Sequence, residues 1–534
     1  MLAFILRFNS LSGSLGGFTN DQFVALSRVE MILQGEQPLR DFADAELRGA
    51  WPALSYEASA WAQQMGGHTL LPEAYLTVGA LVVAQVVVFA LTWIVSGRWW
   101  LASLATALCI VSMPRLYSYP KVLMLACGIA VMRAVMTRPS RWRLALAAVL
   151  TAVAVLFRHD LGGYIAVAII AGLVARDPGA WTLAGRRVGA YLGFTALCLL
   201  PSAIWVQAYE GIPSYIRSNL DVSALEAGRS ELVNLPIPTL STLFTTTILE
   251  VLTYWGLWAV AVVAMIVIAW RVLSPAGRAL TPEDRGFSIG LLLLGIVGIQ
   301  FLVREPLDAR LSDAVIPVSV LGAWTVTLAQ TLTVPIARRV ATLSVSLLLV
   351  CMVAASAVFM GVGRTLSDSG LTSSPGRVTE EYRRVRERLS QLPPTDWSNV
   401  EATGSLAAAR YVAECTSPDD YLLSIGDTPE VTVFARRRFA AGQGVFAKGW
   451  YTSDIEQRRA IAKLESQSAP IMLADAGSYE SDFVPRYPLV AHHVAAHYRK
   501  VGEIPDESRP LLVFVDTARE PRGTDPHFGL PCFR

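Results

Sequence analysis

The chain has few charged residues for its length. Asp, Glu, Lys and Arg make up 16% of its 534 residues, whereas soluble proteins average about 25%. The deficit falls in residues 75–363, where apolar runs are long, while residues 364–534 have an ordinary soluble composition. This pattern excludes a wholly soluble enzyme and a disordered chain, and a formal net charge of +2 does not indicate a nucleic-acid partner.

Cysteine and histidine are also scarce. Six cysteines exclude a disulfide-dense secreted scaffold, and the sequence has no P-loop run, no paired CxxC and no HExxH. His493 and His497 are four residues apart, but neither a neighbouring glutamate nor a third ligand accompanies them, so we predict no metal site there. Cys415 and Cys532, the only cysteines after residue 363, would pair in an oxidising compartment and would otherwise be two free thiols.

Ten segments are apolar and close to the length of a membrane-spanning helix, which needs about 20 residues. They cover residues 75–96, 99–114, 120–137, 143–157, 161–175, 189–209, 248–270, 287–303, 314–336 and 340–363. Segments 143–157 and 161–175 are short, so this pair would form either two crossings or one re-entrant hairpin. The flanking charges favour two crossings.

Arginines gather in alternate connecting loops, which the positive-inside rule places in the cytoplasm. They are Arg98, Arg138, Arg141, Arg143, Arg176, Arg186, Arg187, Arg271, Arg278, Arg285, Arg338 and Arg339. The other loops would lie outside with the tail from residue 364; these are 1–74, 115–119, 158–160, 210–247 and 304–313. The apolar stub Met1–Leu6 looks like the end of a spanning helix, so we expect a first membrane helix that is missing or cut short.

Residues 364–534 predict a small α/β domain in which strands alternate with helices. Strand-like runs cover 421–425, 470–474 and 511–515, and helical patterns cover 376–391, 402–414, 453–467 and 485–499. Residues 364–376 are interpreted as a linker. The basic run Arg436–Arg438 is interpreted as a solvated turn, with contact to acidic lipid or glycan as the alternative. No nucleophile–base pair is evident in this domain, which favours a role in support or in recognition of an acceptor.

The predicted fold is therefore a multi-pass α-helical protein of the cytoplasmic (inner) membrane, with about 10–11 transmembrane helices. Residues 1–363 would form the membrane domain, which includes the first outer loop at 7–74. Residues 364–534 would form a C-terminal extracytoplasmic α/β domain.

The first outer loop contains two predicted amphipathic helices. Apolar residues recur at three- and four-residue spacing between Asn20 and Leu33, and Gly35 would end that helix. Residues 52–65 form the second pattern, with Trp61 and Met65 on its apolar face. These helices would lie in the membrane interface, pack against the membrane helices, or do both. Asp21 falls in the first turn of the first helix, where a carboxylate is either functional or simply favoured by the helix dipole.

Three further outer loops carry an unusual number of charged and aromatic residues. They contain Arg115, Tyr119 and Lys121; Arg158, His159 and Asp160; and Arg304, Asp308, Arg310 and Asp313. Charged groups at membrane depth are costly and tend to be functional, and arginine and lysine are the usual ligands of phosphate. These cations would suit a lipid-borne phosphate. The alternative is a set of solvated or mutually paired loop charges, with Arg158 bound to Asp160.

The first outer loop also resembles that of a known superfamily. Asn20-Asp21-Gln22-Phe23, Gly35-Glu36-Gln37-Pro38 and Arg40-Asp41-Phe42 are similar to the corresponding loop of GT-C membrane glycosyltransferases. The similarity is to the bacterial branch, which includes relatives of protein mannosyltransferases and of the aminoarabinose transferase that modifies lipid A. Asp21 falls on the catalytic carboxylate of that pattern, whereas Gln22 departs from it, because many relatives have Glu there.

This resemblance implies transfer of a sugar from a polyprenyl-phosphate donor to a lipid, glycan or protein acceptor at the outer membrane face. Asp21 would accept the proton of the acceptor hydroxyl. The donor phosphate would contact Arg158, His159, Lys121, Arg115 and Arg304, and other substrate contacts would involve Asp41, Asp44, Tyr119, Asp160 and Arg310. Many relatives work without a metal, although a carboxylate pair in the outer loops would be able to hold a divalent metal.

Two other classes of function remain as alternatives. A transporter or flippase of a lipid-linked glycan would place ionisable residues near the membrane midplane and often has repeated halves, and we see neither pattern. A non-enzymatic envelope assembly protein would leave the cationic outer loops without a role. The charges gather on one face, which favours chemistry at the membrane surface.

Overall fold

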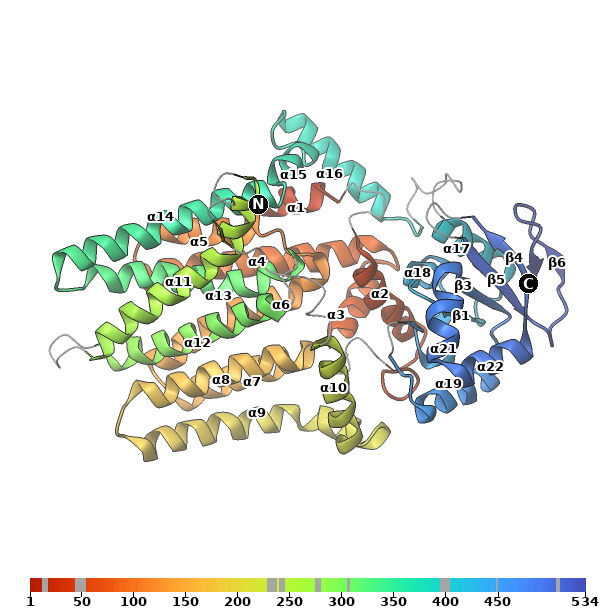
Figure 1. Cartoon of the computed structure of the whole chain (residues 1–534), viewed down its shortest axis with the longest axis horizontal. Coiled ribbons are helices and arrows are strands. Elements are labelled where there is room, and N and C mark those ends of the chain that lie inside the picture. The colour runs from red at the N-terminus through yellow and green to blue at the C-terminus, as the bar shows by residue number, and fades with distance from the viewer. Residues whose placement is uncertain are drawn as a thin grey trace.

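A bundle of long helices lies beside a smaller domain that contains a β-sheet, as Figure 1 shows. This computed structural model describes residues 1–11, 18–43, 54–227, 238–239, 245–273, 280–304, 308–393, 404–447, 450–505 and 510–534. The sheet-containing domain occupies one end of the bundle, and α2 (Asn20–Leu33) and α3 (Leu54–Gly66) lie where the two parts meet.

All ten predicted membrane segments are helical. The helices are α4 (Leu70–Ser96), α5 (Trp99–Val111), α6 (Tyr119–Thr137), α7 (Arg141–Phe157), α8 (His159–Arg176), α9 (Trp181–Tyr209), α11 (Thr247–Leu273), α12 (Pro282–Arg304), α13 (Asp308–Gln330) and α14 (Pro335–Phe359). A short 3₁₀ turn, η1 (Leu116–Ser118), precedes α6. The chain is therefore a polytopic helical membrane protein with a C-terminal α/β domain.

The predicted segments differ from the helices in length. Seven spans in the described part are long and apolar enough to cross a membrane: Leu70–Ser96, Leu116–Thr137, His159–Arg176, Trp181–Tyr209, Thr247–Leu273, Arg310–Gln330 and Pro335–Phe359. Helix α5 has 13 residues and α7 has 17. At about 1.5 Å per residue, α5 is roughly 20 Å long, less than the hydrocarbon thickness of about 30 Å.

Both predicted helices of the first outer loop are present. Helix α2 begins after Thr19, and Gly35, with a φ of +90°, lets the chain turn away beyond its end. Helix α3 buries Tyr56 and Gln63, whereas Trp61 is 62% exposed. One face of α3 therefore packs against protein, while the other exposes a tryptophan. The N-terminal stub forms part of α1 (Leu2–Asn9).

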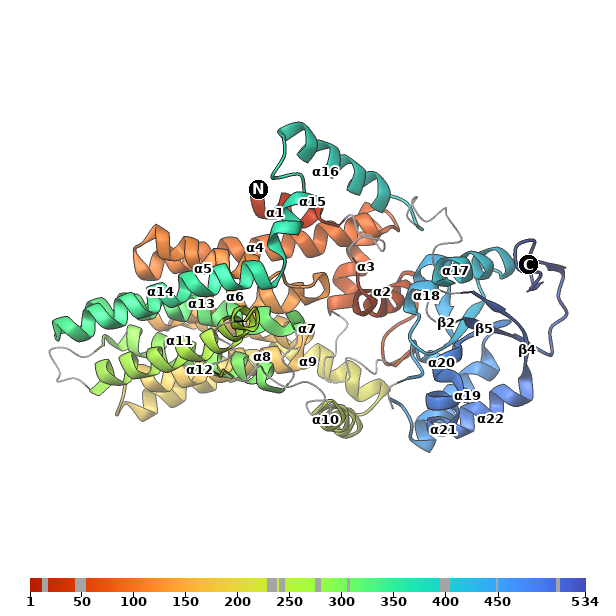
Figure 2. The ribbon, with the colours of Figure 1, turned by 45° about the horizontal axis from the view of Figure 1, so that its top comes forward.

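Helix α10 (Ile212–Ala227) was not predicted and lies in the connection after α9. It runs across the direction of the bundle helices, as a comparison of Figures 1 and 2 shows. Ile212, Ile216 and Leu220 recur every four residues and are exposed, while Tyr215 is buried. This amphipathic pattern is typical of a helix that lies along a membrane surface.

The C-terminal domain is built on a mixed five-stranded sheet in the order β2-β1-β3-β5-β4. Its strands are β1 (Tyr421–Ile425), β2 (Arg438–Phe439), β3 (Ile471–Asp475), β4 (Tyr498–Ile504) and β5 (Leu511–Asp516). Strand β1 pairs in parallel with β2 and β3, and β5 pairs antiparallel with β3 and β4. The three predicted strands are thus the three central ones, whose short apolar sequences fill the domain core.

Helices cover this sheet, as the sequence predicts. They include α17 (Gly404–Cys415), α18 (Pro429–Ala435), α19 (Asp454–Ser466) and α22 (Pro488–His497). Part of the predicted linker is helical, as α15 (Val362–Asp368), and α16 (Pro375–Leu389) packs on the bundle through Tyr382 and Phe8, whose ring centroids are 5.1 Å apart. The sheet and its covering helices therefore begin at Gly404.

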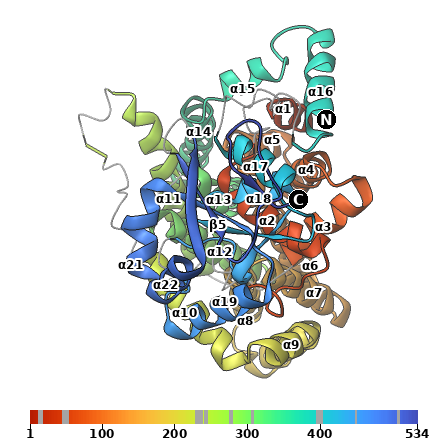
Figure 3. The same ribbon diagram turned by 90° about the vertical axis from the view of Figure 1, so that its right-hand side faces the viewer.

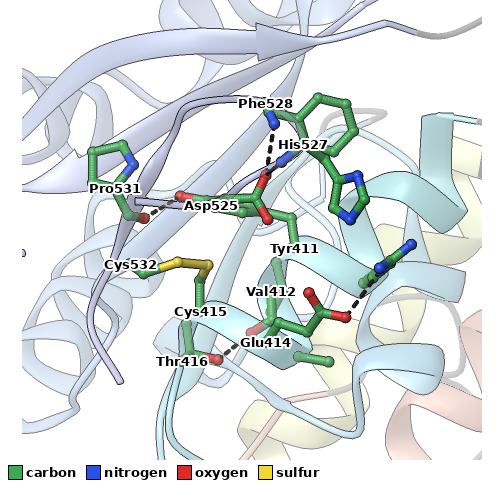
Figure 4. The surroundings of a disulfide bond; sticks show 12 residues. Tyr411, Val412, Glu414, Cys415, Thr416, Asp525, His527, Phe528, Pro531 and Cys532 are labelled. Carbon is green, nitrogen blue, oxygen red and sulfur yellow. Dashed lines mark hydrogen bonds and ion pairs between the residues drawn. A yellow bond between two sulfur atoms is a disulfide. The ribbon is translucent and has the colours of Figure 1, made fainter. Parts of the chain in front are cut away.

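The predicted disulfide is present and closes the domain. Cys415 at the end of α17 is bonded to Cys532 in β7 (Pro531–Cys532), which pairs with β6 (Gly523–Thr524) (Figure 4). Beside it, the Tyr411 hydroxyl donates to the Pro531 carbonyl at 2.7 Å, and the Phe533 amide donates to the Cys415 carbonyl at 2.8 Å. The C-terminal segment is therefore anchored to the first helix of the domain.

Aromatic contacts hold the domain against the first outer loop. Phe23 of α2 lies 5.0 Å from Phe434 of α18, and Phe42 lies 5.6 Å from Phe439 of β2, measured between ring centroids. Figure 3, viewed from the domain side, shows the sheet in front of α2 and the bundle helices. These buried rings fix the loop that carries Asp21 between the two parts of the molecule.

The interpretation of the basic run as a solvated turn was wrong for Arg437. Its side chain is 5% exposed and donates to the Thr416 hydroxyl at 2.9 Å and to the carbonyls of Ala413 and Thr416, each at 3.0 Å. Arg438 lies over the ring of Tyr421 at 4.1 Å. A buried guanidinium requires acceptors for its donors, and these carbonyls at the end of α17 supply them.

Candidate functional site

Asp21 lies in the first turn of α2 with a side chain that is 42% exposed. Arg115, which precedes η1, places Nη1 3.3 Å from Asp21 Oδ2 and Nη2 3.4 Å from Asp308 Oδ1. One guanidinium thus connects α2, η1 and the start of α13. Arg115 was predicted as a phosphate ligand, and the structure places it between two carboxylates.

Lys121 lies in the first turn of α6 and not in a loop. Its Nζ is 2.7 Å from Oδ2 of Asp313 on α13, and the two side chains are only 11% and 12% exposed. This pair brings together residues that are 192 positions apart in the sequence. The cost of burying both charges is offset by their close contact.

Arg158 and Asp160 form a local ion pair at the junction of α7 and α8. Arg158 Nε lies 3.0 Å from Asp160 Oδ1, and Nη2 lies 2.5 Å from Oδ2, so the contact is bidentate. Asp160 Oδ1 also accepts a hydrogen bond from the Leu161 amide at 2.8 Å. The pairing of Arg158 with Asp160, which the sequence left as an alternative, is confirmed.

These two ion pairs line one cavity of ≈ 370 Å³, a volume that includes space open to solvent. Lys121, Arg158, Asp160 and Asp313 make its charged side. The remaining lining is mainly apolar and consists of Leu125, Leu161, Tyr164, Leu294 and Gly298. A cavity with charges on one side and leucines on the other suits a ligand that is itself amphiphilic.

His159 and Tyr119 are among the predicted site residues that are not part of this lining. The His159 Nε2 atom is 3.0 Å from the hydroxyl of Tyr215, so His159 contacts α10. Tyr119 is 4% exposed and its ring lies 6.2 Å from that of Phe157. Both residues are close in sequence to cavity residues, but their side chains occupy other positions.

Asp41 lies at the contact with the α/β domain, apart from the Asp21 cluster. Its carboxylate accepts a hydrogen bond from the Gln37 amide at 2.7 Å and pairs with Arg40, while its carbonyl accepts one from Lys463. Partial burial raises the pKa of the Asp41 carboxyl. The hydrogen bonds from Arg40 and from the Gln37 amide lower this pKa by more, so it lies below its usual value. Asp41 therefore belongs to the structure of the loop–domain contact.

The other predicted site residues are Asp44, Arg304 and Arg310. Asp44 and the side chain of Arg304, the last residue of α12, lie outside the described part. Arg310 is on α13, three residues before Asp313. Among the described residues, no group of three or more His, Cys, Asp or Glu side chains is arranged to hold a metal ion.

A buried polar pair beside Asp21 was missed. Gln22 Nε2 donates to Glu73 Oε1 at 2.5 Å, and both residues are at most 2% exposed. Glu73 is a lone acid at the start of an apolar run, which is the signal that would have identified it. Gln22 is also the residue that departs from the GT-C pattern, and a Glu there would bring two carboxylates together. The amide supplies the donor that Glu73 needs.

Comparison with known proteins finds similarity among solved structures. No family model matches the chain, and no curated protein matches it. Among solved structures, the chain is similar to ArnT from Cupriavidus metallidurans, which was crystallised with bound undecaprenyl phosphate. The similarity covers 96% of each chain, with 13% sequence identity and a TM-score of 0.47.

Proposed function

We propose that the chain is a membrane glycosyltransferase that moves a hexosyl or pentosyl group from a polyprenyl-phosphate sugar to a lipid, glycan or protein acceptor. The observation that carries the proposal is the amphiphilic cavity lined by Lys121 and Arg158, at the end of the bundle where Asp21 lies. We further propose that this end faces the outside of the cytoplasmic membrane, as the loop arginines predict.

The cavity supports a lipid-phosphate donor for two reasons. Its leucine wall suits the first units of a polyprenyl chain, and its two cations suit a phosphate. Each cation now contacts a carboxylate, so a bound phosphate would share or replace Asp313 and Asp160 as the partner. The neighbouring acids would thereby limit the affinity for a phosphate that brings no apolar group with it.

Asp21 is the proposed general base. The acceptor oxygen attacks the anomeric carbon, the bond from that carbon to the phosphate oxygen breaks, and the polyprenyl phosphate leaves with the bonding electrons. The acceptor proton passes to Asp21, whose orientation Arg115 holds. Asp308, the second partner of Arg115, is five residues before Asp313 on α13, about 7.5 Å along the helix axis, so the base and the phosphate site lie toward the same end of this helix.

Replacement of the base tests this proposal. We expect Asp21→Asn to lower the transfer rate by about 10²–10⁴-fold, the usual contribution of a general base, while binding of undecaprenyl phosphate is retained. The measurement is sugar transfer from radiolabelled undecaprenyl-phosphate sugars by the full chain in nanodiscs. Asp454→Asn is the matched control, because Asp454 is also in the first turn of a helix but lies in the α/β domain.

Unchanged transfer by Asp21→Asn would refute the role of Asp21. A flippase is distinguished by its product, since it would carry the lipid-linked sugar across a proteoliposome membrane without forming a new glycosidic bond. Crossing without transfer in the unmodified chain would refute the proposed enzyme.

A further inference from the structure

A second cavity of ≈ 530 Å³ lies where the first outer loop, the end of α9 and the α/β domain meet. Phe42 comes from the loop, Tyr209 from α9, and Gln443 and Tyr451 from the domain. It does not share any lining residue with the cavity that contains Lys121. This volume, like that of the first cavity, includes space open to solvent.

Several contacts hold the three walls together. Trp205 Nε1 donates to the Pro38 carbonyl at 3.2 Å, and the ring of Trp205 lies 4.5 Å from that of Tyr209. The Ala43 amide donates to the Gly442 carbonyl at 2.8 Å. Hydrogen bonds therefore connect the loop to both α9 and the α/β domain, and these contacts determine the shape of the cavity.

The backbone around this cavity is unusually strained. Leu39, Ala441 and Tyr451 have φ values of +63°, +63° and +56°, in the left-handed region that residues with a Cβ rarely adopt. All three line the cavity. Strain of this kind costs about 1–3 kcal/mol per residue and is concentrated at binding and catalytic sites.

The chemistry of the lining is polar and aromatic but balanced in charge. Glu210 and Glu456 offset Arg459 and Lys463, so the cavity does not favour an anion. Gln443 is 5% exposed, and its Oε1 has no hydrogen-bond partner among the described residues. A buried acceptor without a partner is costly, and a ligand hydroxyl would supply the missing donor.

We infer that this second cavity binds a neutral saccharide and, given the proposed function, that it holds the glycan part of the acceptor. Tyr209 and Tyr451 line the cavity, and the C–H groups of a sugar bind well against aromatic side chains. Gln443 accepts a hydrogen bond from a sugar hydroxyl, and Arg459 donates one. The α/β domain thus takes part in substrate recognition and does not serve only as support.

Saturation-transfer NMR on the full chain in nanodiscs tests the inference without requiring transfer activity. The probes are mannotriose and galactotriose, which are neutral, and trigalacturonic acid, which is acidic. We expect at least one neutral trisaccharide to bind more tightly than the acidic one. Gln443→Leu, which removes a buried acceptor, and Arg459→Ala, at an exposed position, should each weaken binding about tenfold.

Gln391→Leu is the matched control, because it makes the same replacement at an exposed position outside the cavity. Thermal unfolding of every variant identifies loss of fold. Three results would overturn the inference. They are absence of neutral-sugar binding, preference for the acidic probe, and binding by Gln443→Leu and Arg459→Ala that is as tight as binding by the unmodified chain. Asp21→Asn should bind the trisaccharide normally, so failure of the proposed catalysis and failure of this saccharide site give different results.

Discussion

Lys121 and Asp313 form the more buried of the two ion pairs that line the first cavity. An ion pair removed from water contributes little net stability, because the desolvation cost offsets the attraction between the charges. A pair of leucine-sized residues would fill the same space at no electrostatic cost. The presence of charges at this depth is therefore better explained by a ligand that the lysine binds.

Opposite effects of two substitutions at this pair test that explanation. Lys121→Ala should weaken binding of undecaprenyl phosphate by about tenfold or more, since it removes a charged hydrogen-bond donor. Asp313→Asn should maintain or strengthen binding, because it removes a competing anion and leaves the lysine. The measurement is the increase in thermal unfolding temperature with added undecaprenyl phosphate, using the full chain in nanodiscs.

The stability of each variant must be measured without lipid, because a lone buried charge is destabilising. The double variant Lys121→Met, Asp313→Asn removes both charges and serves as the control for folding. Equal loss of lipid binding in Lys121→Ala and Asp313→Asn would contradict the proposed role, since it would indicate damage to the cavity and not loss of a phosphate ligand.

Sequence distance decides which of these contacts was predictable. Asp21 was placed correctly in a first helical turn because Asn20 and the apolar spacing after it are local signals. The Arg158–Asp160 pair was foreseen for the same reason, since its members are two residues apart. The Lys121–Asp313 contact depends on how α6 and α13 pack, and a single sequence does not contain that information.

At the scale of elements, the disulfide joins the first helix of the α/β domain to its last strand. It closes a loop of 117 residues, and constraint of such a long loop in the unfolded chain usually contributes about 2–4 kcal/mol. Replacement of Cys415 and Cys532 by alanine should lower the unfolding temperature of this domain by roughly 5–15 °C. Differential scanning calorimetry measures the change.

Cys351→Ala is the matched control for this prediction, because Cys351 is a free cysteine on α14. Reductant should destabilise the unmodified protein by a similar amount and should not affect the double alanine variant. An unfolding temperature that is insensitive to both treatments would show that the hydrogen bonds around Cys415 already hold the C-terminal segment in place.

Two elements were misjudged from sequence for different reasons. The predicted helix at 485–499 ends at His497, where β4 begins, because Tyr498 and the residues after it pair with β5. That tertiary pairing overrides a helical pattern that continues for two more residues. Helix α10, in contrast, carries a local signal in Ile212, Ile216 and Leu220, but residues 210–247 are predicted as a loop because they contain no apolar run long enough to span a membrane.

At the scale of the whole molecule, the loops sort to two ends of the bundle as the arginine pattern predicts. At the end away from the α/β domain, Arg176 donates to the Met136 carbonyl at 2.8 Å and Arg271 to the Thr331 carbonyl at 3.1 Å. At the other end, Arg115 connects Asp21 with Asp308. Alternate loops lie at the same end only if every helix between them runs from one end of the bundle to the other. The short helices α5 and α7 therefore also run between the two ends.

Site-specific labelling determines which end of the bundle faces the cytoplasm. We expect Glu520→Cys, in the α/β domain, to react with a membrane-impermeant maleimide in intact bacterial spheroplasts, because the domain should lie outside. Arg339→Cys, at the arginine-rich end, should react only after the membrane is permeabilised. Both residues are exposed in the structure, so a difference in labelling reports the membrane barrier and not burial.

The labelling requires a background in which the free cysteines Cys109, Cys127, Cys198 and Cys351 are replaced by alanine, while the disulfide is kept. Reversed labelling would contradict the positive-inside assignment and would place Asp21 and both cavities on the cytoplasmic side. The proposed donor and acceptor would then have to reach the site from the cytoplasm. Orientation therefore bears on the chemistry directly, because it determines which pool of lipid-linked sugar the first cavity can meet.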